Sequence, residues 1–256
     1  MTVGMVFSFL FGLAVGSFLN VCIYRIPLKK SIVNPPSSCP QCGSRIRWYD
    51  NIPLFSYLLL LGRCRHCHTR ISLRYPLVEF VVGLLSVVLF IRSGPTLQYL
   101  FLFLFTAALV AIAFIDLDHK IIPDVISLPG ILVGLAFSFF PSAGNSPVEA
   151  LIGAVGGAAF LLLVGMAFEK ATGREGMGGG DVKLLGMIGA WMGWKALPFI
   201  ILLSSFTGAV IGGLSLAVSR QGMRSRIPFG PFLALGALIF LFFGDEIVLW
   251  FYRLGR

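Results

Sequence analysis

The strongest constraint on the fold of this chain is its succession of long apolar runs. The sequence has 256 residues, of which 57% are apolar and only 12% are charged. A run of about 20 apolar residues is long enough to cross a bilayer as a helix. The pattern therefore predicts an all-α, polytopic membrane protein embedded in a lipid bilayer. The apolar runs lie near residues 3–24, 77–92, 97–115, 124–140, 148–168, 184–218 and 229–250.

The run at 184–218 is too long for a single crossing. As one helix it would extend about 52 Å at about 1.5 Å per residue, whereas the hydrocarbon core of a bilayer is about 30 Å thick. Gly193, Lys195 and Pro198 mark a possible tight turn between two shorter spans. Basic loops on both sides of the run also require an even number of crossings. The sequence thus predicts about eight transmembrane helices.

The first apolar segment, residues 1–24, is expected to be a retained transmembrane helix. A signal peptide would have a basic region before the apolar run and small residues at a cleavage site. Neither feature is evident in this segment. Its N-terminus is expected to lie outside the cytoplasm.

The basic residues predict the orientation of the chain in the membrane. Four loops assigned to the cytoplasm carry 16 of the 20 Lys and Arg residues, as the positive-inside rule requires. The net charge of +9 is therefore read as a topology signal, and no nucleic-acid partner is expected. The acidic motifs described below then face the cytoplasm. The four loops are 25–76, 116–123, 169–183 and 219–228.

One loop carries a metal-binding pattern. Cys39 and Cys42 form one CxxC pair, and Cys64 and Cys67 form a second pair, with 21 residues between the two pairs. Two such pairs can supply four thiolates to one tetrahedral zinc ion. The alternative is a pair of disulfides, which rarely persist in a reducing compartment. A structural zinc is favoured, because a loop this small cannot build its own core.

Two aspartates at membrane boundaries predict the chemistry. The chain has only 11 acidic residues, and carboxylates beside the hydrocarbon are costly enough that a functional role is the default interpretation. Asp116 ends the third apolar run, and Asp181 begins the sixth span. Two carboxylates that share one proton can act as general base on water and as general acid on the leaving amine. Asp116 and Asp181 are therefore the candidate catalytic pair of an aspartic protease.

Other residues of the same two motifs are expected to support this pair. Gly178 and Gly180 would let the backbone approach an extended peptide closely. Asp118 and Asp124 have an alternative interpretation as helix caps or solvated loop residues, which is given even weight. Lys183 completes the set of candidate substrate-binding or supporting residues.

Glu79 is a further acid at a membrane edge. It follows Tyr75 and Pro76 near the start of the second apolar run. It is either a helix-start charge favoured by the helix dipole or a residue that helps to bind a second substrate. In the second case its carboxylate would hold a cationic amine through a charge-assisted hydrogen bond.

Together these motifs resemble one known family, the bacterial type IV prepilin peptidases, along nearly the whole chain. The motifs that carry the resemblance are Gly16-Ser17-Phe18-Leu19-Asn20-Val21 with Arg25 and Pro27, the paired CxxC sequences, Arg74-Tyr75-Pro76-Leu77-Val78-Glu79, the stretch from Asp116 to Asp124, residues 176–185, and Pro228-Phe229-Gly230-Pro231-Phe232.

The resemblance implies a membrane aspartic protease of the GxGD type, with Asp116 and Asp181 as its catalytic pair. Its substrates would be prepilins and pseudopilins, cut after a Gly on the cytoplasmic side of the bacterial inner membrane. Members with a Cys-bearing loop also methylate the new N-terminal residue with S-adenosylmethionine. Asn20, Arg25 and Glu79 are associated with that second activity, whose donor site is not located by the sequence.

This interpretation divides the chain into three parts. Residues 1–24 are the first transmembrane helix, residues 25–76 are a cytoplasmic four-cysteine zinc loop associated with methyl transfer, and residues 77–256 are the peptidase core. Three alternatives remain: a peptidase without methyltransferase activity, a proton-coupled transporter, and a non-enzymatic zinc-bearing assembly factor. The last would leave both aspartate motifs unexplained.

Overall fold

The structure, a computed structural model, describes residues 2–173, 176–219 and 228–254. Most of the predicted basic loop at 219–228 lies outside the described residues. The described elements are all helical apart from two isolated β-bridges, so the predicted all-α class is confirmed. The chain forms two compact units, Met1–Ala111 and Ile112–Arg256, and α4 (Leu97–His119) contributes its last turns to the second unit.

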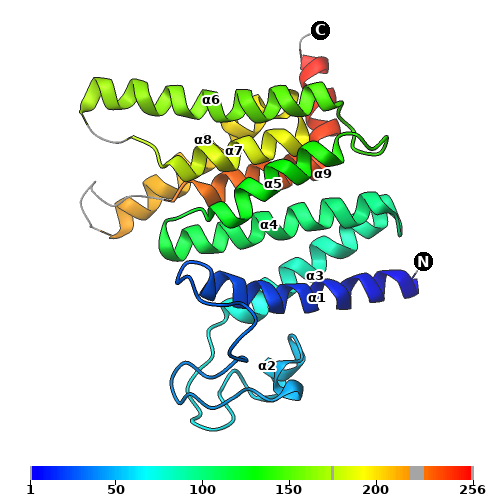
Figure 1. Cartoon of the computed structure of the whole chain (residues 1–256), viewed down its shortest axis with the longest axis vertical. Helices are drawn as coiled ribbons and strands as arrows, with labels where there is room; N and C mark the ends of the chain where they lie inside the picture. Colours follow the sequence, from blue (N-terminus) through cyan, green and yellow to red (C-terminus); the bar gives the residue numbers. More distant parts are fainter. Residues whose placement is uncertain (1, 174–175, 220–227, 255–256) are drawn as a thin grey trace. The chain divides into compact units, whose positions relative to one another are not determined.

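The first unit is built on a close antiparallel pair, α1 (Thr2–Arg25) and α3 (Arg74–Ser93), drawn in blue and cyan in Figure 1. A Cβ at residue 12 would lie 2.7 Å from the Cα of Gly83, and a Cβ at residue 16 would lie 2.7 Å from the Cα of Glu79. Glycines spaced by four residues thus bring the two backbones together, as in membrane helix pairs generally. Ser86 adds a buried hydrogen bond from its hydroxyl to the carbonyl of Ser8, 2.6 Å long.

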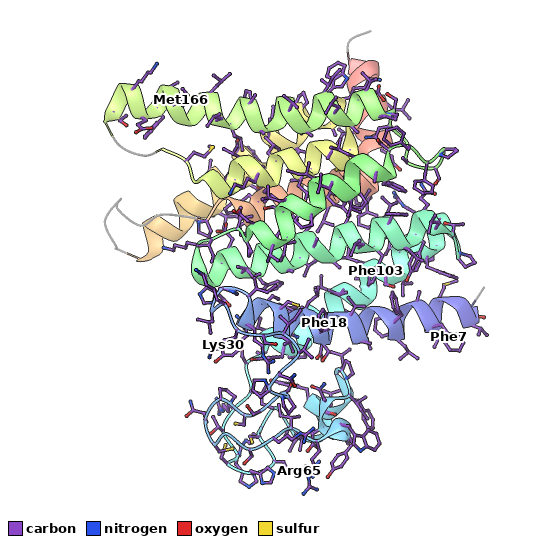
Figure 2. The ribbon with its side chains drawn as sticks, in the orientation of Figure 1. Phe7, Phe18, Lys30, Arg65, Phe103 and Met166 are labelled. Carbon is purple, nitrogen blue, oxygen red and sulfur yellow. The ribbon has the colours of Figure 1, made fainter. Side chains whose placement is uncertain are left out.

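The loop between α1 and α3 contains two short helical segments, a 3₁₀ turn at Trp48–Asn51 and α2 (Phe55–Leu59). Asp50, the only acid between residues 25 and 76, accepts hydrogen bonds from Arg65, which is labelled in Figure 2. The Arg65 guanidinium lowers the pKa of the Asp50 carboxyl. This ion pair ties the 3₁₀ turn to the segment of the second CxxC pair.

The second unit contains α5 (Asp124–Phe137), α6 (Pro147–Thr172), α7 (Gly179–Met192), α8 (Leu197–Ser219) and α9 (Gly230–Leu254). Figure 1 shows α6 along α7, and the two backbones touch where Gly153 meets Gly189. On another side of α7, Trp191 Nε1 donates a 2.8 Å hydrogen bond to the carbonyl of Gly130 in α5. The helix that begins with the second aspartate motif is thus held on two sides.

The long apolar run at 184–218 is divided between α7 and α8. Gly193 ends α7 with φ of 74°, a left-handed conformation that glycine adopts without strain, and a 3₁₀ turn at Trp194–Ala196 leads into α8. The predicted turn is therefore present. Two helices, not one, occupy this run.

Among the described residues, five helices are long and apolar enough to cross a membrane: α1, α3, α4, α6 and the segment Trp194–Leu214. The helices Asp124–Phe137 and Gly230–Gly244 are apolar but shorter. Many large apolar side chains of the spans are exposed, as expected for helices that face lipid. The structure thus supports a multi-pass membrane protein, and it bears out five candidate spans of the predicted eight.

Candidate active site and metal centre

Asp116 lies in the last turn of α4, with only 5% of its surface exposed. The backbone N–H of Gly230, the first residue of α9, donates a 3.0 Å hydrogen bond to Asp116 Oδ2. A Cβ at residue 230 would lie 2.7 Å from that same oxygen. The approach of this N–H to the carboxylate therefore requires glycine at position 230.

Asp181 lies in the first turn of α7, where it is half-buried. Its N–H donates a 3.1 Å hydrogen bond to the carbonyl of Gly178, and a Cβ at residue 178 would lie 3.3 Å from Asp181 Oδ2. The negative charge of Asp116 acts electrostatically on the Asp181 carboxylate. The two aspartates, 65 residues apart in sequence, are thus close enough in the second unit for their charges to interact.

Ile122 lies between the elements that carry the two aspartates. A Cβ at residue 180 would lie 2.9 Å from the Cβ of Ile122, and a Cβ at residue 230 would lie 3.2 Å from Ile122 Cδ1. Ile122 is buried at 9% exposure. The connection between α4 and α5 therefore packs against both Gly180 and Gly230, next to the carboxylates.

An ion pair links the two aspartate motifs at the surface. Lys183 Nζ lies 2.7 Å from Asp124 Oδ1, with side-chain exposures of 39% and 56%. Asp124 is the first residue of α5 and makes no side-chain cap; the residue before it, Pro123, is the N-cap. Asp124 therefore does not cap α5.

Asp118 is exposed in the last turn of α4, so it cannot act as an N-cap of that helix.

The arrangement of the carboxylates suits acid–base chemistry. Two carboxylates that interact in a partly buried site favour a state in which they share one proton. Such a pair can deprotonate a water molecule with one member and protonate a departing group with the other. The Gly230 N–H occupies one oxygen of Asp116, Oδ2, and thereby orients this carboxylate.

The four cysteines of the first unit form a cluster whose sulfur atoms all lie within 4.8 Å of one another. The Cys39 and Cys67 sulfurs are 3.8 Å apart, and the Cys42 and Cys64 sulfurs are 4.0 Å apart. A disulfide requires about 2.05 Å, and the four thiols are free. Tetrahedral zinc with Zn–S of about 2.3 Å requires sulfurs about 3.8 Å apart, so the cluster fits one such ion.

The two CxxC segments have the same backbone fold. In the first, the N–H of Gly43 donates to the Cys39 carbonyl at 2.9 Å; in the second, the N–H of His68 donates to the Cys64 carbonyl at 3.0 Å. Both donors have left-handed φ, 70° for Gly43 and 56° for His68. Each segment is closed by an isolated β-bridge, Ser38 to Arg45 and Arg63 to Arg70. The loop thus consists of two matching knuckles.

Hydrogen bonds favour the thiolate form of one cysteine in each knuckle. The hydroxyl and backbone N–H of Thr69 lower the pKa of Cys67 to about 6, and Ser44 lowers the pKa of Cys42 in the same way. Ser44 and Thr69 occupy the same position, two residues after the second cysteine. Since metals bind the thiolate, these contacts prepare both cysteines as ligands.

The structure also places Asn20, Arg25 and Glu79 in the first unit. Glu79 is the sixth residue of α3, not a first-turn acid, and only 8% of it is exposed. It accepts a 2.9 Å hydrogen bond from the N–H of Leu54 and another from the Ser17 hydroxyl. The interpretation of Glu79 as a helix-start charge is therefore wrong.

Asn20 and Arg25 both connect α1 to other parts of the unit. Asn20 is buried, and its amide donates a 3.0 Å hydrogen bond to the carbonyl of Tyr75. Arg25 donates to the carbonyls of Ser31 and Pro35 at 2.9 and 2.7 Å. Arg25 thereby holds the start of the cysteine loop against the end of α1.

The sequence analysis missed three residues with a place in these sites. Gly230 and Ile122 lie beside the aspartates, and Ser17 contacts Glu79. All three belong to motifs on which the family resemblance was based, so position within a motif was the available signal. Their roles depend on contacts between distant segments, which one sequence does not reveal.

Comparisons with known proteins identify the family to which this sequence is similar. A model of the Bacterial Peptidase A24 N-terminal domain matches residues 10–93, and a model of the Type IV leader peptidase family matches residues 103–213. No solved structure gives a significant match.

Several curated relatives are named "Prepilin leader peptidase/N-methyltransferase". The relative from Pseudomonas putida is 43% identical, covering 92% of this chain and 89% of its own. The relative from Aeromonas hydrophila is 43% identical, covering 95% and 92%. The relative from Pseudomonas aeruginosa is 42% identical, covering 94% and 90%. With this identity over nearly its whole length, the chain belongs to the type IV leader peptidase family.

Proposed function

We propose that this protein is a bifunctional membrane enzyme that cleaves the leader from prepilins and pseudopilins and then N-methylates the new N-terminal residue. The observation that carries the proposal is the approach of both aspartate segments to one side chain: Gly180, next to Asp181, and Gly230, whose N–H bonds Asp116, both pack against Ile122. The names of the relatives support both activities. A proton-coupled transporter is not favoured, because both acids gather at helix ends within a peptidase family fold.

Cleavage follows from the shared proton of the pair. The ionised carboxylate accepts a proton from water as the water oxygen attacks the scissile carbonyl carbon. The protonated carboxylate donates a hydrogen bond to the carbonyl oxygen, which gains negative charge. Collapse of the tetrahedral species breaks the C–N bond, and the departing amine takes a proton from a carboxylic acid of the pair. The supporting residues Asp118, Asp124, Gly178, Gly180 and Lys183 are expected to line the path of the leader.

The methyl transfer needs no metal at the reacting atoms. The free amine of the cleaved pilin attacks the methyl carbon of S-adenosylmethionine, the C–S bond breaks with its electron pair staying on sulfur, and the amine loses one proton. Asn20, Arg25 and Glu79 are the residues proposed to serve this step. The cluster of Cys39, Cys42, Cys64 and Cys67 holds one structural zinc ion that supports the loop.

The topology is part of the proposal. All eight apolar helices, including α5, α7 and α9, would cross or enter the bilayer of the inner membrane. Both sites would face the cytoplasm, because the basic loops flank them. Residues 1–24 would be the first span, residues 25–76 the zinc loop, and residues 77–256 the peptidase core.

One experiment tests both activities. The purified protein is incubated in detergent with a prepilin and S-adenosylmethionine, and the N-terminus of the product is read by mass spectrometry. We expect a product that has lost its leader up to and including a Gly and that carries one methyl group on its new N-terminal amine. A cleaved but unmethylated product would mean that the protein is a peptidase without methyltransferase activity. An uncleaved prepilin would refute the proposal.

A further inference from the structure

The first unit contains a cavity between the C-terminal half of α1 and the cysteine loop. Its volume is about 360 Å³, within the range of about 300–1,000 Å³ that is usual for small-molecule sites. Phe18, labelled in Figure 2, lies on the part of α1 that forms one wall. The lining includes Ser17, Phe18, Val21, Arg25, Asn51 and Pro53.

The cavity lies next to charges of both signs. Ser17 forms part of the wall and hydrogen-bonds the buried carboxylate of Glu79. Arg25 also lines the cavity; its guanidinium uses one N–H for Ser31 and one for Pro35, which leaves three of its five N–H groups for a ligand. A ligand in the cavity can therefore place a cation towards Glu79 and an anion towards Arg25.

The apolar part of the wall suits a flat ring. Phe18 lines the cavity and is 50% exposed, and Pro53 adds rigid apolar surface to the lining. Asn51 supplies an amide that can donate and accept hydrogen bonds at the edge of a heterocycle. Aromatic and apolar surface with a few polar groups is the usual composition of a nucleoside site.

We propose that this cavity is the binding site for S-adenosylmethionine, a location that rests on the proposed methyltransferase function. The donor carries a carboxylate for Arg25, a sulfonium cation for the Ser17 and Glu79 side, and an adenine ring for Phe18. The N-terminus of a cleaved pilin offers a cationic amine but no free carboxylate beside it. The guanidinium of Arg25 therefore favours the donor over the acceptor.

This location also connects the metal to methyl transfer. The loop wall of the cavity, which includes Asn51 and Pro53, belongs to the segment between the two CxxC pairs. Leu54, the next residue, has left-handed φ of 59° and bonds Glu79 through its N–H. Leu54 keeps this strained conformation because its N–H bonds the buried Glu79 carboxylate. Strained backbone of this kind is common at functional sites, which supports a functional role for this wall of the cavity. The metal cluster would hold the same loop.

The test measures binding directly on the full-length, zinc-loaded protein in detergent. Val21→Phe fills the cavity, and Val6→Phe makes the same change at a 58% exposed position of α1 outside it. We expect Val21→Phe to raise the Kd for S-adenosylmethionine at least about tenfold in isothermal titration calorimetry, a loss of about 1.4 kcal/mol. Val6→Phe should bind as the unaltered protein does. Both should still cleave prepilin.

A second variant tests the charge assignment. Arg25→Gln should weaken binding of S-adenosylmethionine about tenfold and leave binding of decarboxylated S-adenosylmethionine unchanged. Lys29→Gln, a change of charge in the same loop outside the cavity lining, should alter neither. Equal weakening of both ligands would show that Arg25 does not recognise the donor carboxylate. If Val21→Phe also abolished cleavage, Arg25→Gln would decide.

The outcomes separate this site from the proposed function. If Val21→Phe bound S-adenosylmethionine as tightly as the unaltered protein, the proposed site would be overturned. If it bound the donor normally but no longer methylated the product, the cavity would be assigned to the acceptor amine instead. Equal loss of both ligands in Arg25→Gln would also overturn it. If the unaltered protein neither bound nor used the donor while cleaving prepilin, the methyltransferase function itself would fail.

Discussion

The backbone N–H of Gly230 donates a hydrogen bond to Asp116 Oδ2 across a sequence separation of 114 residues. Gly230 begins α9 and Asp116 lies in the last turn of α4. A single backbone donor, on a residue with no side chain to obstruct it, thereby orients one of the two aspartates. This contact makes the start of α9 part of the candidate active site.

Removing this orientation should reduce cleavage. In Gly230→Ala the new Cβ would stand 2.7 Å from Asp116 Oδ2, so the carboxylate or the start of α9 must move. We expect the rate of prepilin cleavage to fall at least about tenfold, which corresponds to about 1.4 kcal/mol of transition-state stabilisation. Gly213→Ala is the matched control, because nothing lies within 4 Å of a Cβ at that position of α8. Equal activity of the two variants would show that the contact is dispensable.

The aspartate pair itself is expected to be essential. Asp116→Asn and Asp181→Asn each remove an ionisable group at nearly constant shape. Loss of general acid–base catalysis should lower cleavage by about 100-fold or more. The yield of the variants in the membrane fraction controls for folding. Asp118→Asn, at an exposed position of the same motif, should be much milder. Full cleavage by either of the first two variants would remove that residue from the catalytic pair.

The ion pair between Lys183 and Asp124 should contribute little to stability. Both side chains are substantially exposed, and such pairs are usually worth less than about 1 kcal/mol. A double-mutant cycle with Lys183→Met and Asp124→Asn, read by thermal unfolding in detergent, should give a coupling energy in that range. A coupling above about 2 kcal/mol would indicate that the pair holds the two motifs together.

The cysteine cluster should hold one zinc ion per chain. Cys64→Ala removes one of the four ligands and should abolish stoichiometric metal in elemental analysis of protein purified under reducing conditions. Cys22→Ala, at a buried cysteine outside the cluster, should retain the metal. Lower pH should release the ion, because protons compete for the thiolates. Metal-free but folded unaltered protein would refute the zinc site.

Glu79→Gln should separate the two activities. The change keeps the size of the side chain but removes the charge and one acceptor oxygen for the bonds from Leu54 and Ser17. We expect methylation of cleaved pilin to fall about tenfold or more while cleavage stays unchanged. Glu169→Gln, at an exposed position of α6, should affect neither. Parallel loss of both activities in folded Glu79→Gln would mean that the two sites are shared.

The sequence alone determined the features that depend on local pattern. Apolar runs predict membrane helices because crossing a bilayer requires a continuous apolar stretch. The spacing of Cys39, Cys42, Cys64 and Cys67 predicts a metal site because each ligand pair is a local turn, and the knuckles have that form. The break at Gly193 also follows from a local conformation.

Tertiary structure decided what each polar side chain contacts. Sequence reasoning gave Asp124 a possible role as a helix cap and Glu79 a possible place in the first turn of its helix. The structure instead shows an ion pair from Asp124 to Lys183 and a hydrogen bond from the Leu54 N–H to Glu79. The structure also places the N–H of Gly230 in hydrogen-bond contact with Asp116. These contacts join segments 25 to 114 residues apart. They depend on how loops and helix ends come together in three dimensions, which a pattern of period 3.6 along one chain does not specify.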